Sequence, residues 1–477
     1  MPGDTQRAQL APRLCAIRAR RPASAAWELC RGLPILASAA IGMLFLAHAW
    51  LYRGFTTDDA FITFRIVRQW THGHGLVYNV GERVEGYSDF LWVLLLAPCD
   101  ALGLDLVLAA KLLGLLCALL TLSVATQLTR GLRWPGITLL LVAVSGPFAA
   151  WSMGGLETPL FALLLTLGGI LFLAEEKEGR GWLSGLVFGL LALTRPEGLF
   201  FAGVTIICRA WSLLRYGQRP ARRDAYRLLA LAALVVPYIL WRLAYYGALL
   251  PNTVYAKAMG LHPRALLEGA FYLYQNLTSL GGFLPLALGT ASLLGWEGLG
   301  ARRPGGAPPF PRAAYALIVL VAYGLFVLIS GGDWMPMQRF LVPVLPWACL
   351  LIHEGIAQLA EWVSGQGVHQ RWVNLLMGLL VAGQAGLFLA GSLEQRLIGG
   401  VGQGSITPAL DARVAYLRDH GRPGNVVALV DAGLPAYVLP LETRVIDMVG
   451  LTDAHIARLP AQFPHGLLGQ GDGFGKW

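Results

Sequence analysis

Charged residues are scarce in this chain. Only 14% of its 477 residues are Asp, Glu, Lys or Arg, whereas an ordinary soluble domain carries roughly 25%. Hydrophobic residues make up 56%, and they recur in continuous runs of about 20 residues, the length of a membrane-spanning helix. The runs do not alternate between apolar and polar positions, so the spans are helices rather than barrel strands. The composition excludes a soluble globular protein and predicts an all-α polytopic membrane protein.

Several binding signals are also missing. The six cysteines show no CxxC spacing, so the sequence indicates neither a disulfide framework nor a thiolate metal site. The glycine-rich pieces at 73–75 and 399–404 lack the strand-to-helix context and the Lys-Ser/Thr pair of a phosphate loop. The net charge of +9 does not indicate nucleic acid, because most arginines lie in short links between apolar runs, where they set membrane topology.

The N-terminal segment fixes the expected orientation. Residues 1–32 contain six arginines and almost no acid. A cleaved signal peptide is the competing interpretation, since Ala47-His48-Ala49 matches an A-x-A-like cleavage site. The apolar segment 33–52 is longer than a usual signal core and long enough to span. We therefore interpret 1–32 as a basic cytoplasmic leader of a multi-pass protein of the cell inner membrane, with its N-terminus inside.

Apolar run length predicts about eleven spans within a transmembrane domain of residues 33–391. Two of these expected spans are 135–150 and 280–294, and 262–277 is expected to form a peripheral amphipathic helix. Residues 392–477 are more polar. We expect them to form a small α/β extramembrane domain on the periplasmic side, with short strands and turns over 425–450 and a truncated end.

The stretch 56–92 is the densest polar segment, within an expected catalytic first outer loop 53–105. Asp58 and Asp59 begin it, directly beyond the first apolar segment. Acids beside a membrane span are functional candidates, although Thr-Thr-Asp-Asp before an apolar helix is also good capping chemistry. Arginine-rich links alternate with motif-bearing links, which places the polar clusters of the chain on one outer face. Beyond Asp58, these clusters contain Glu157, Arg195, Glu197, Lys257, Asp333 and Arg339.

The motifs resemble a known class. These are DDAFITFR, GHGLVYNVGERVEGYSDFLW, GLETPLFALLL, LTRPEG, YYGALLPNTVYAK and GGDWMPMQRFLVPVLP. Together they are similar to GT-C-fold polytopic membrane glycosyltransferases, and in particular to the mycobacterial terminal arabinofuranosyltransferases, over about residues 33–350. The resemblance implies transfer of a monosaccharide, expected to be arabinofuranose, with inversion. The donor would be a polyprenyl-phosphate sugar, and the acceptor a periplasmic or cell-surface glycan, lipid or protein.

The resemblance also implies roles for single residues. Asp58, in preference to Asp59, would be the general base that takes the acceptor proton. Basic residues would bind the donor phosphate, although snorkelling at the membrane surface is the better explanation for any single one of them. These are Arg65, Arg195, Arg242, Lys257 and Arg339, with Lys257 and Arg339 preferred and with Arg195 able to pair with Glu197 instead.

The remaining candidates are acids, tyrosines and one amide. Carboxylates at Glu85, Glu157 and Asp333 would orient sugar hydroxyls, against the alternative of structural hydrogen bonds in loops. Tyr87 and Tyr246 would stack on sugar or line the prenyl groove, against the alternative of an interfacial aromatic belt. Asn252, inside the YYGALLPNTVYAK motif, is an expected substrate-binding residue.

Metal dependence stays open at this stage. His72 and His74 have no clustered third ligand, so we expect no tight zinc site. Asp58 and Asp59 with Asp333 offer oxygen ligands for a divalent cation, Mg²⁺ or Mn²⁺. Two other functions also remain: a transporter or flippase of lipid-linked sugar, and a non-catalytic membrane subunit. Against a transporter, the charges gather in outer loops and no inverted repeat is evident.

Overall fold

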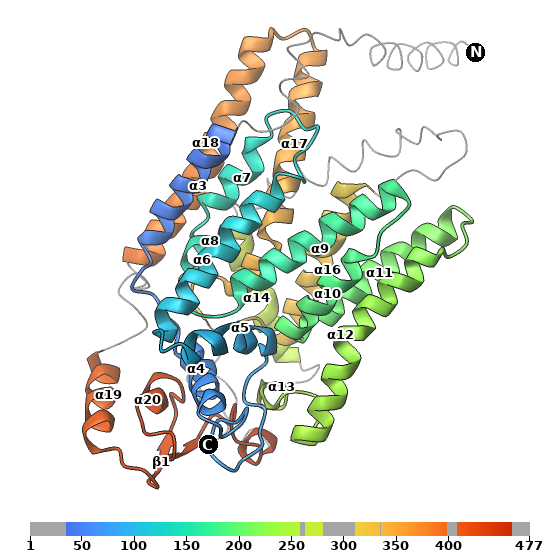
Figure 1. Cartoon of the computed structure of the whole chain (residues 1–477). Coiled ribbons are helices and arrows are strands. Elements are labelled where there is room, and N and C mark those ends of the chain that lie inside the picture. The colour runs from blue at the N-terminus through green and yellow to red at the C-terminus, as the bar shows by residue number, and fades with distance from the viewer. Residues whose placement is uncertain (1–34, 258–262, 280–310, 334, 398–407, 460–477) are drawn as a thin grey trace.

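The structure is a computed structural model of the whole chain, and it describes residues 35–257, 263–279, 311–333, 335–397 and 408–459. The expected leader 1–32 and the expected span 280–294 lie outside the described residues. Long helices form most of the described chain, and the C-terminal region lies at one end of them (Figure 1). The predicted fold class, an all-α membrane domain with a small α/β region, is confirmed.

Seven helices of the described chain are long and apolar enough to cross a membrane. They are α6 (Leu106–Ala125), α9 (Thr158–Glu178), α11 (Glu197–Arg215), α12 (Arg222–Tyr246), α16 (Arg312–Ser330), the 3-10 helix η2 (Arg339–Val344) continued by α17 (Leu345–Gly365), and α18 (Gln370–Leu397). Three shorter apolar helices accompany them: α3 (Ile35–Trp50), α5 (Phe90–Ala101) and α10 (Leu183–Thr194).

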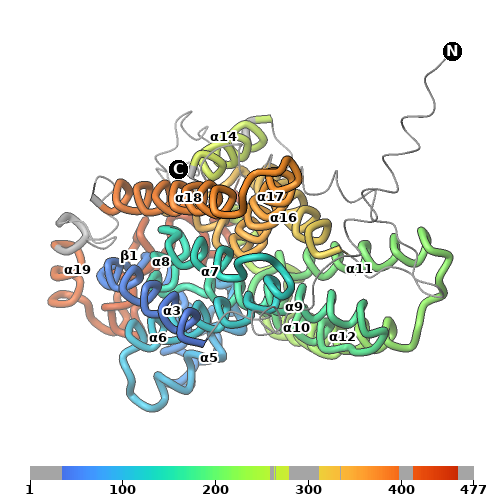
Figure 2. Tube along the Cα trace, turned by 90° about the horizontal axis from the view of Figure 1, so that it is seen from above, coloured from blue at the N-terminus to red at the C-terminus, as the bar shows by residue number. Residues whose placement is uncertain are grey.

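The long helices differ in how much of their surface other helices cover. In the span formed by η2 and α17, 94% of the residues of an 18-residue apolar window are buried, so this span is the centre of the bundle, whereas the shares in α12 and α18 are only 22% and 17%. Seen from above, α9, α10 and α12 lie side by side, and α18 runs along the outside of α17 (Figure 2). The apolar outer faces of α12 and α18 are the surfaces that lipid would cover.

The expected span 135–150 is not one continuous helix. The segment forms two short helices, α7 (Gly136–Ala143) and α8 (Gly146–Trp151), separated by Val144 and Ser145. Ser145 has an extended backbone, and Pro147 lies in the first turn of α8. Proline has no N–H to continue the ladder of α7, but it fits the first turn of a new helix. An apolar run of suitable length therefore conceals a break in the helix.

Three further helices belong to the described chain. They are α4 (Asp58–Thr71), α13 (Asn252–Lys257) and α14 (Pro263–Ser279). The last forms where an amphipathic helix was expected at 262–277.

Charged residues gather at both ends of α9, which is about 30 Å long. At its C-terminal end, Glu175 and Glu176 form ion pairs with Arg227 from α12, and Glu176 also pairs with Arg209 from α11. At its N-terminal end, Glu157 pairs with Arg195 at 2.6 Å. Two sets of buried ion pairs about one bilayer apart mark the two membrane surfaces.

The C-terminal region is a small α/β unit. It contains α19 (Pro408–His420), β1 (Val426–Leu429), α20 (Leu434–Tyr437), β2 (Arg444–Asp447) and the 3-10 helix η4 (Ile456–Arg458). The strands pair in parallel, with Val426 opposite Arg444 and Leu429 opposite Asp447. Parallel strands need a crossover, and α20 forms part of it. The first residues of the segment 436–442 therefore lie in a helix, whereas the sequence predicted strands and turns there.

Candidate active site

The N-terminus of α4 presents the acid pair. Asp58 and Asp59 are the first two residues of the helix, and both are half-buried. Thr57 precedes them in an extended conformation and makes no side-chain cap, while its N–H donates to the Gly154 carbonyl at 3.1 Å. The carboxylates therefore lie where the partial positive charge of the helix end favours them, beside the loop that begins α9.

The Asp58 carboxylate is held by the C-terminal region. The N–H of Gly433 donates to Oδ2 at 2.9 Å, and the N–H of Leu434 donates to Oδ1 at 2.8 Å. Burial raises the pKa of Asp58 to about 6, and the nearby charges of Asp59 and Asp431 add to this, while the two N–H groups oppose it. The side chain is thus a stronger base than an ordinary aspartate and is still largely ionised at neutral pH.

Arg65 fastens α4 to the same region. Its guanidinium is fully buried, and it donates to four backbone carbonyls, at Tyr78, Ala436, Leu441 and Thr443. Gln69, one turn further along, donates to the Leu441 carbonyl at 2.8 Å. Every contact of Arg65 is structural, so we leave it out of the phosphate-binding residues that the sequence indicated.

Glu157, Arg195 and Glu197 come together as one buried cluster. Arg195 links both acids, each at 2.6 Å, and its position between α10 and α11 faces the start of α9. Asp89 lies next to them, accepts from the Thr63 hydroxyl at 3.0 Å, and has its pKa raised by burial and by the charge of Glu157. Because three acids surround one guanidinium here, the cluster is better suited to accept hydrogen bonds from hydroxyl groups than to bind a phosphate.

Asp333 and Arg339 also form an ion pair. The Arg339 Nε lies 2.7 Å from Asp333 Oδ2, and the guanidinium carbon lies 5.7 Å from the Trp151 ring and 5.3 Å from the Phe340 ring. The Arg195 guanidinium carbon lies 5.8 Å from the same Phe340 ring. The two ion-paired clusters therefore share one aromatic wall, and the positive charge of Arg339 is already balanced.

Glu85 forms an ion pair with Arg242 at 2.8 Å, and it accepts a hydrogen bond from the Tyr238 hydroxyl at 2.9 Å. Burial raises the pKa of Glu85, and Arg242 opposes the rise. Nearby, the hydroxyls of Tyr87 and Tyr246 are 3.2 Å apart, and Tyr246 donates to the Leu76 carbonyl. These groups join the first outer loop to α12.

Asn252 and Lys257 lie at either end of α13, with very different surroundings. The Asn252 amide is buried and donates to three backbone carbonyls of the C-terminal region, at Gly450, Leu451 and Asp453. Lys257 is exposed and forms no ion pair within the described part of the chain. Of the two expected binding residues, Asn252 has a structural role and Lys257 is available to a ligand.

Two further exposed cations lie close to α13, and the sequence analysis did not select them. Arg83 lies over the Tyr245 ring, with 4.9 Å between guanidinium carbon and centroid. Arg458 lies over the Tyr255 ring at 4.5 Å and donates to Asn252 Oδ1 at 3.3 Å. Within the described residues neither has a carboxylate partner. Arg83 lies inside the motif GHGLVYNVGERVEGYSDFLW, but nothing in the sequence distinguished it from the other charges there, and none of the quoted motifs contained Arg458.

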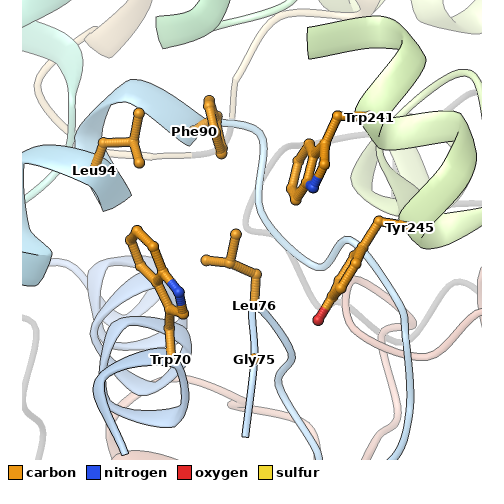
Figure 3. A pocket seen from close by; sticks show the side chains of 7 residues that line it. All are labelled: Trp70, Gly75, Leu76, Phe90, Leu94, Trp241 and Tyr245. Atoms are coloured by element: carbon orange, nitrogen blue, oxygen red, sulfur yellow. The ribbon is translucent and has the colours of Figure 1, made fainter. Parts of the chain in front are cut away.

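A pocket of about 390 Å³ opens between α4, α5 and α12. Figure 3 shows Trp70 on one side, Trp241 and Tyr245 on the other, and Leu76 between them. Phe90 and Leu94 of α5 form its roof, and Gly75 completes the lining. The walls are almost entirely apolar, and Arg83 lies at the Tyr245 side, so the pocket suits an apolar chain that ends in an anion.

Two of the three candidate cation ligands have other partners. Asp333 is paired with Arg339, and Asp58 accepts from two backbone N–H groups. Among the described residues, no group of three or more His, Cys, Asp or Glu side chains is placed to hold a metal ion.

Residues 403–473 match a family described as a domain of unknown function (DUF8728). The chain is 28% identical over 362 residues to the terminal β-(1→2)-arabinofuranosyltransferase of Mycobacterium tuberculosis, a match that covers 67% of this chain and 55% of the relative. The enzyme of the same description from Corynebacterium glutamicum is 27% identical over 366 residues, covering 65% and 49%. The chain thus spans about half the length of these relatives.

Solved structures share the architecture. ArnT from Cupriavidus metallidurans, bound to undecaprenyl phosphate, superposes with a TM-score of 0.56 at 15% identity, covering 85% of this chain and 84% of ArnT. The Archaeoglobus fulgidus oligosaccharyltransferase, in complex with zinc and sulfate, superposes with a TM-score of 0.57 at 11% identity, covering 85% and 62%. The chain therefore has the GT-C fold and resembles the terminal arabinofuranosyltransferases, as the sequence predicted.

Proposed function

We propose that this protein is a membrane glycosyltransferase that transfers a monosaccharide, arabinofuranose, from a polyprenyl-phosphate donor to a hydroxyl of a glycan, lipid or protein acceptor. Two kinds of likeness support this. The arabinofuranosyltransferases match two thirds of the chain, and a GT-C structure that carries undecaprenyl phosphate covers most of it. The observation that carries the chemistry is Asp58, half-buried at a helix N-terminus with its pKa near 6.

In the proposed step, Asp58 takes the proton of the acceptor hydroxyl as the oxygen attacks the anomeric carbon. The bond between that carbon and the phosphate oxygen breaks, and polyprenyl phosphate leaves with the bonding electrons. Attack from the face opposite the leaving group inverts the anomeric configuration. The negative charge of Asp59 disfavours ionisation of the neighbouring Asp58 and so makes Asp58 a stronger base.

Phosphate binding is assigned to the cations without acidic partners. Arg83, Lys257 and Arg458 come from the first outer loop, α13 and η4, and these segments meet where the Asn252 N–H donates to the Glu85 carbonyl at 3.0 Å. Arginine and lysine both bind phosphate strongly when no carboxylate competes. The aromatic pocket beside Arg83 then takes part of the prenyl tail.

The buried acids are assigned to the sugar. Glu157 and Glu197 around Arg195, and Asp333 beside Arg339, offer carboxylate oxygens held in fixed positions by their guanidinium partners. Such oxygens accept hydrogen bonds from sugar hydroxyls without having to move. Tyr87 and Tyr246 lie between the pocket and Glu85, where a sugar ring would pass.

The orientation is part of the proposal. The ion pairs of Glu175 and Glu176 lie at the end where the arginine-rich links gather, and we place that end in the cytoplasm of a cell whose inner membrane holds the protein. Asp58 and the C-terminal region then face the periplasm. Labelling of single cysteines introduced at Arg83 and at Arg219 with a membrane-impermeant reagent tests this, because only the first should react in intact spheroplasts.

The activity is tested by offering purified protein a panel of synthetic polyprenyl-phosphate monosaccharides together with arabinan oligosaccharide acceptors. The proposal expects a new glycosidic bond with one donor and release of polyprenyl phosphate in equal amount. Donor movement across proteoliposomes without bond formation would instead identify a transporter of lipid-linked sugar. Absence of both with all donors would refute the assignment.

A further inference from the structure

The loop 431–434 of the C-terminal region approaches Asp58 unusually closely. Gly433 is buried, and a Cβ at this position would meet both the main-chain oxygen and Oδ2 of Asp58 at distances that real Cβ atoms do not show. The φ of Gly433 is −88°, so a glycine is required by contact rather than by a left-handed backbone. Only a residue without a side chain allows its N–H to reach the carboxylate.

The loop has little freedom to move away. The Tyr78 hydroxyl donates to the Ala432 carbonyl at 2.5 Å, and Arg65 donates to the Ala436 carbonyl at 2.6 Å. Further along, Asn79 bonds to both the N–H and the carbonyl of Val445, each at 2.9 Å. Three side chains of α4 and the first outer loop therefore hold the backbone on both sides of Gly433, which fixes the direction of its N–H.

The charges around Asp58 also come partly from this loop. Asp431 pairs with Arg413 of α19 at 2.6 Å, with both side chains about half exposed. Asp59 is the neighbour on α4, and Tyr78 of the first outer loop lies near enough for an electrostatic interaction with Asp58. The ionised groups that act on Asp58 are thus one acid of its own helix and one acid of the C-terminal region, and the latter is paired with Arg413.

We infer that the loop 431–434 is part of the catalytic apparatus, with the N–H groups of Gly433 and Leu434 holding the Asp58 carboxylate in place and the Asp431–Arg413 pair setting the charge beside it. This rests on the proposed role of Asp58 as the base. It gives the domain of unknown function a definite task, which is to position a residue of the membrane domain. Gly433 and Asp431 are positioning residues, since they touch Asp58 rather than substrate.

The first test needs no turnover. The carboxyl infrared band of Asp58 is obtained as the difference between the full-length protein and Asp58→Asn, and it is titrated from about pH 4 to 8. Asp431→Asn removes a negative charge and should lower the midpoint by about half a pH unit, and Arg413→Gln should raise it by a similar amount. Asp419→Asn is the matched control, because Asp419 lies exposed on α19 and should leave the midpoint unchanged.

The second test follows turnover. Gly433→Ala should lower kcat roughly 100-fold, while the KM for the polyprenyl-phosphate donor changes by less than about twofold, because a displaced base leaves donor binding intact. Gly383→Ala, in open space on α18, is the control for the glycine substitution. If Gly433→Ala does not fold, the charge variants decide the question.

Equal midpoints for Asp431→Asn, Arg413→Gln and Asp419→Asn would overturn the inference, as would full activity of a folded Gly433→Ala. The proposed function fails separately, if Asp58→Asn retains turnover. In that case the infrared titration still reports whether the loop sets the state of the carboxylate.

Discussion

Replacing Arg195 by methionine should be among the most damaging single changes in the described chain. Its guanidinium bridges Glu157 and Glu197, and the side chains are 15%, 4% and 9% exposed. Removing one partner of a buried ion pair typically costs about 3–5 kcal/mol, because the remaining charge is left in a poor solvent. Here two carboxylates lose the same partner with Asp89 beside them, so we expect the upper half of that range.

Arg444→Met provides the comparison. Arg444 and Glu82 are 2.7 Å apart, nearly the same separation, but their side chains are 60% and 32% exposed. An exposed pair is worth about 0–1 kcal/mol. Reversible unfolding of the two variants in the same detergent should therefore differ by at least about 2 kcal/mol in free energy, although each removes one ion-paired arginine.

A third variant separates charge from shape. Arg195→Met combined with Glu157→Gln and Glu197→Gln removes the whole ionic cluster, and it should recover much of the lost stability because no buried charge is left without a partner. Equal stability losses for Arg195→Met and Arg444→Met would contradict the reasoning. So would a triple variant that is less stable than Arg195→Met alone.

Three other expectations follow from the site. Because the pKa of Asp58 lies near 6, its ionised fraction, and with it kcat/KM, should fall about tenfold between pH 7 and pH 5. An ordinary aspartate would lose less than about a tenth of its ionised fraction over the same range. A flat pH–rate profile would exclude Asp58 as the titrating base. Arg83→Gln with Lys257→Gln should raise the KM for the donor roughly tenfold or more with kcat nearly constant, and Lys177→Gln at the other end of α9 is the control that should leave KM unchanged. Gly75→Ala should weaken the binding of long-chain prenyl phosphate, measured by competition. Gly75 has a φ of +91°, and an added Cβ would lie 2.5 Å from the Tyr245 hydroxyl. Unchanged competition would exclude the pocket as the site of the prenyl tail.

The sequence predicted the membrane class and the fold because lipid imposes simple rules on composition and run length. It could not distinguish one continuous helix from two short helices at 135–150, since hydropathy averages over a break that depends on Pro147. Some of the polar residues that it grouped on one face do form contacts: Glu157 pairs with Arg195, and Asp333 pairs with Arg339. The side of the membrane on which they lie stays a prediction.

The sequence was less informative about what each polar residue does there. Arg65 and Asn252 look like ligand-binding residues in a linear motif, but their partners are backbone carbonyls of a region more than 190 residues away. Arg83 lies in one of the quoted motifs but was not selected, because its relation to Tyr245 and the pocket depends on the packing of the first outer loop against α12. Long-range contacts decide whether a charge is free, and a single sequence does not contain them.

The central claim is tested most directly by single-turnover transfer from decaprenyl-phosphoryl arabinofuranose to an arabinan oligosaccharide, measured with the unmodified protein and with Asp58→Asn alongside donor binding to both. We expect the variant to bind donor with an unchanged Kd and to transfer it about 10²–10⁴ times more slowly, the usual contribution of a positioned general base. Transfer by Asp58→Asn at the rate of the unmodified protein would contradict the account.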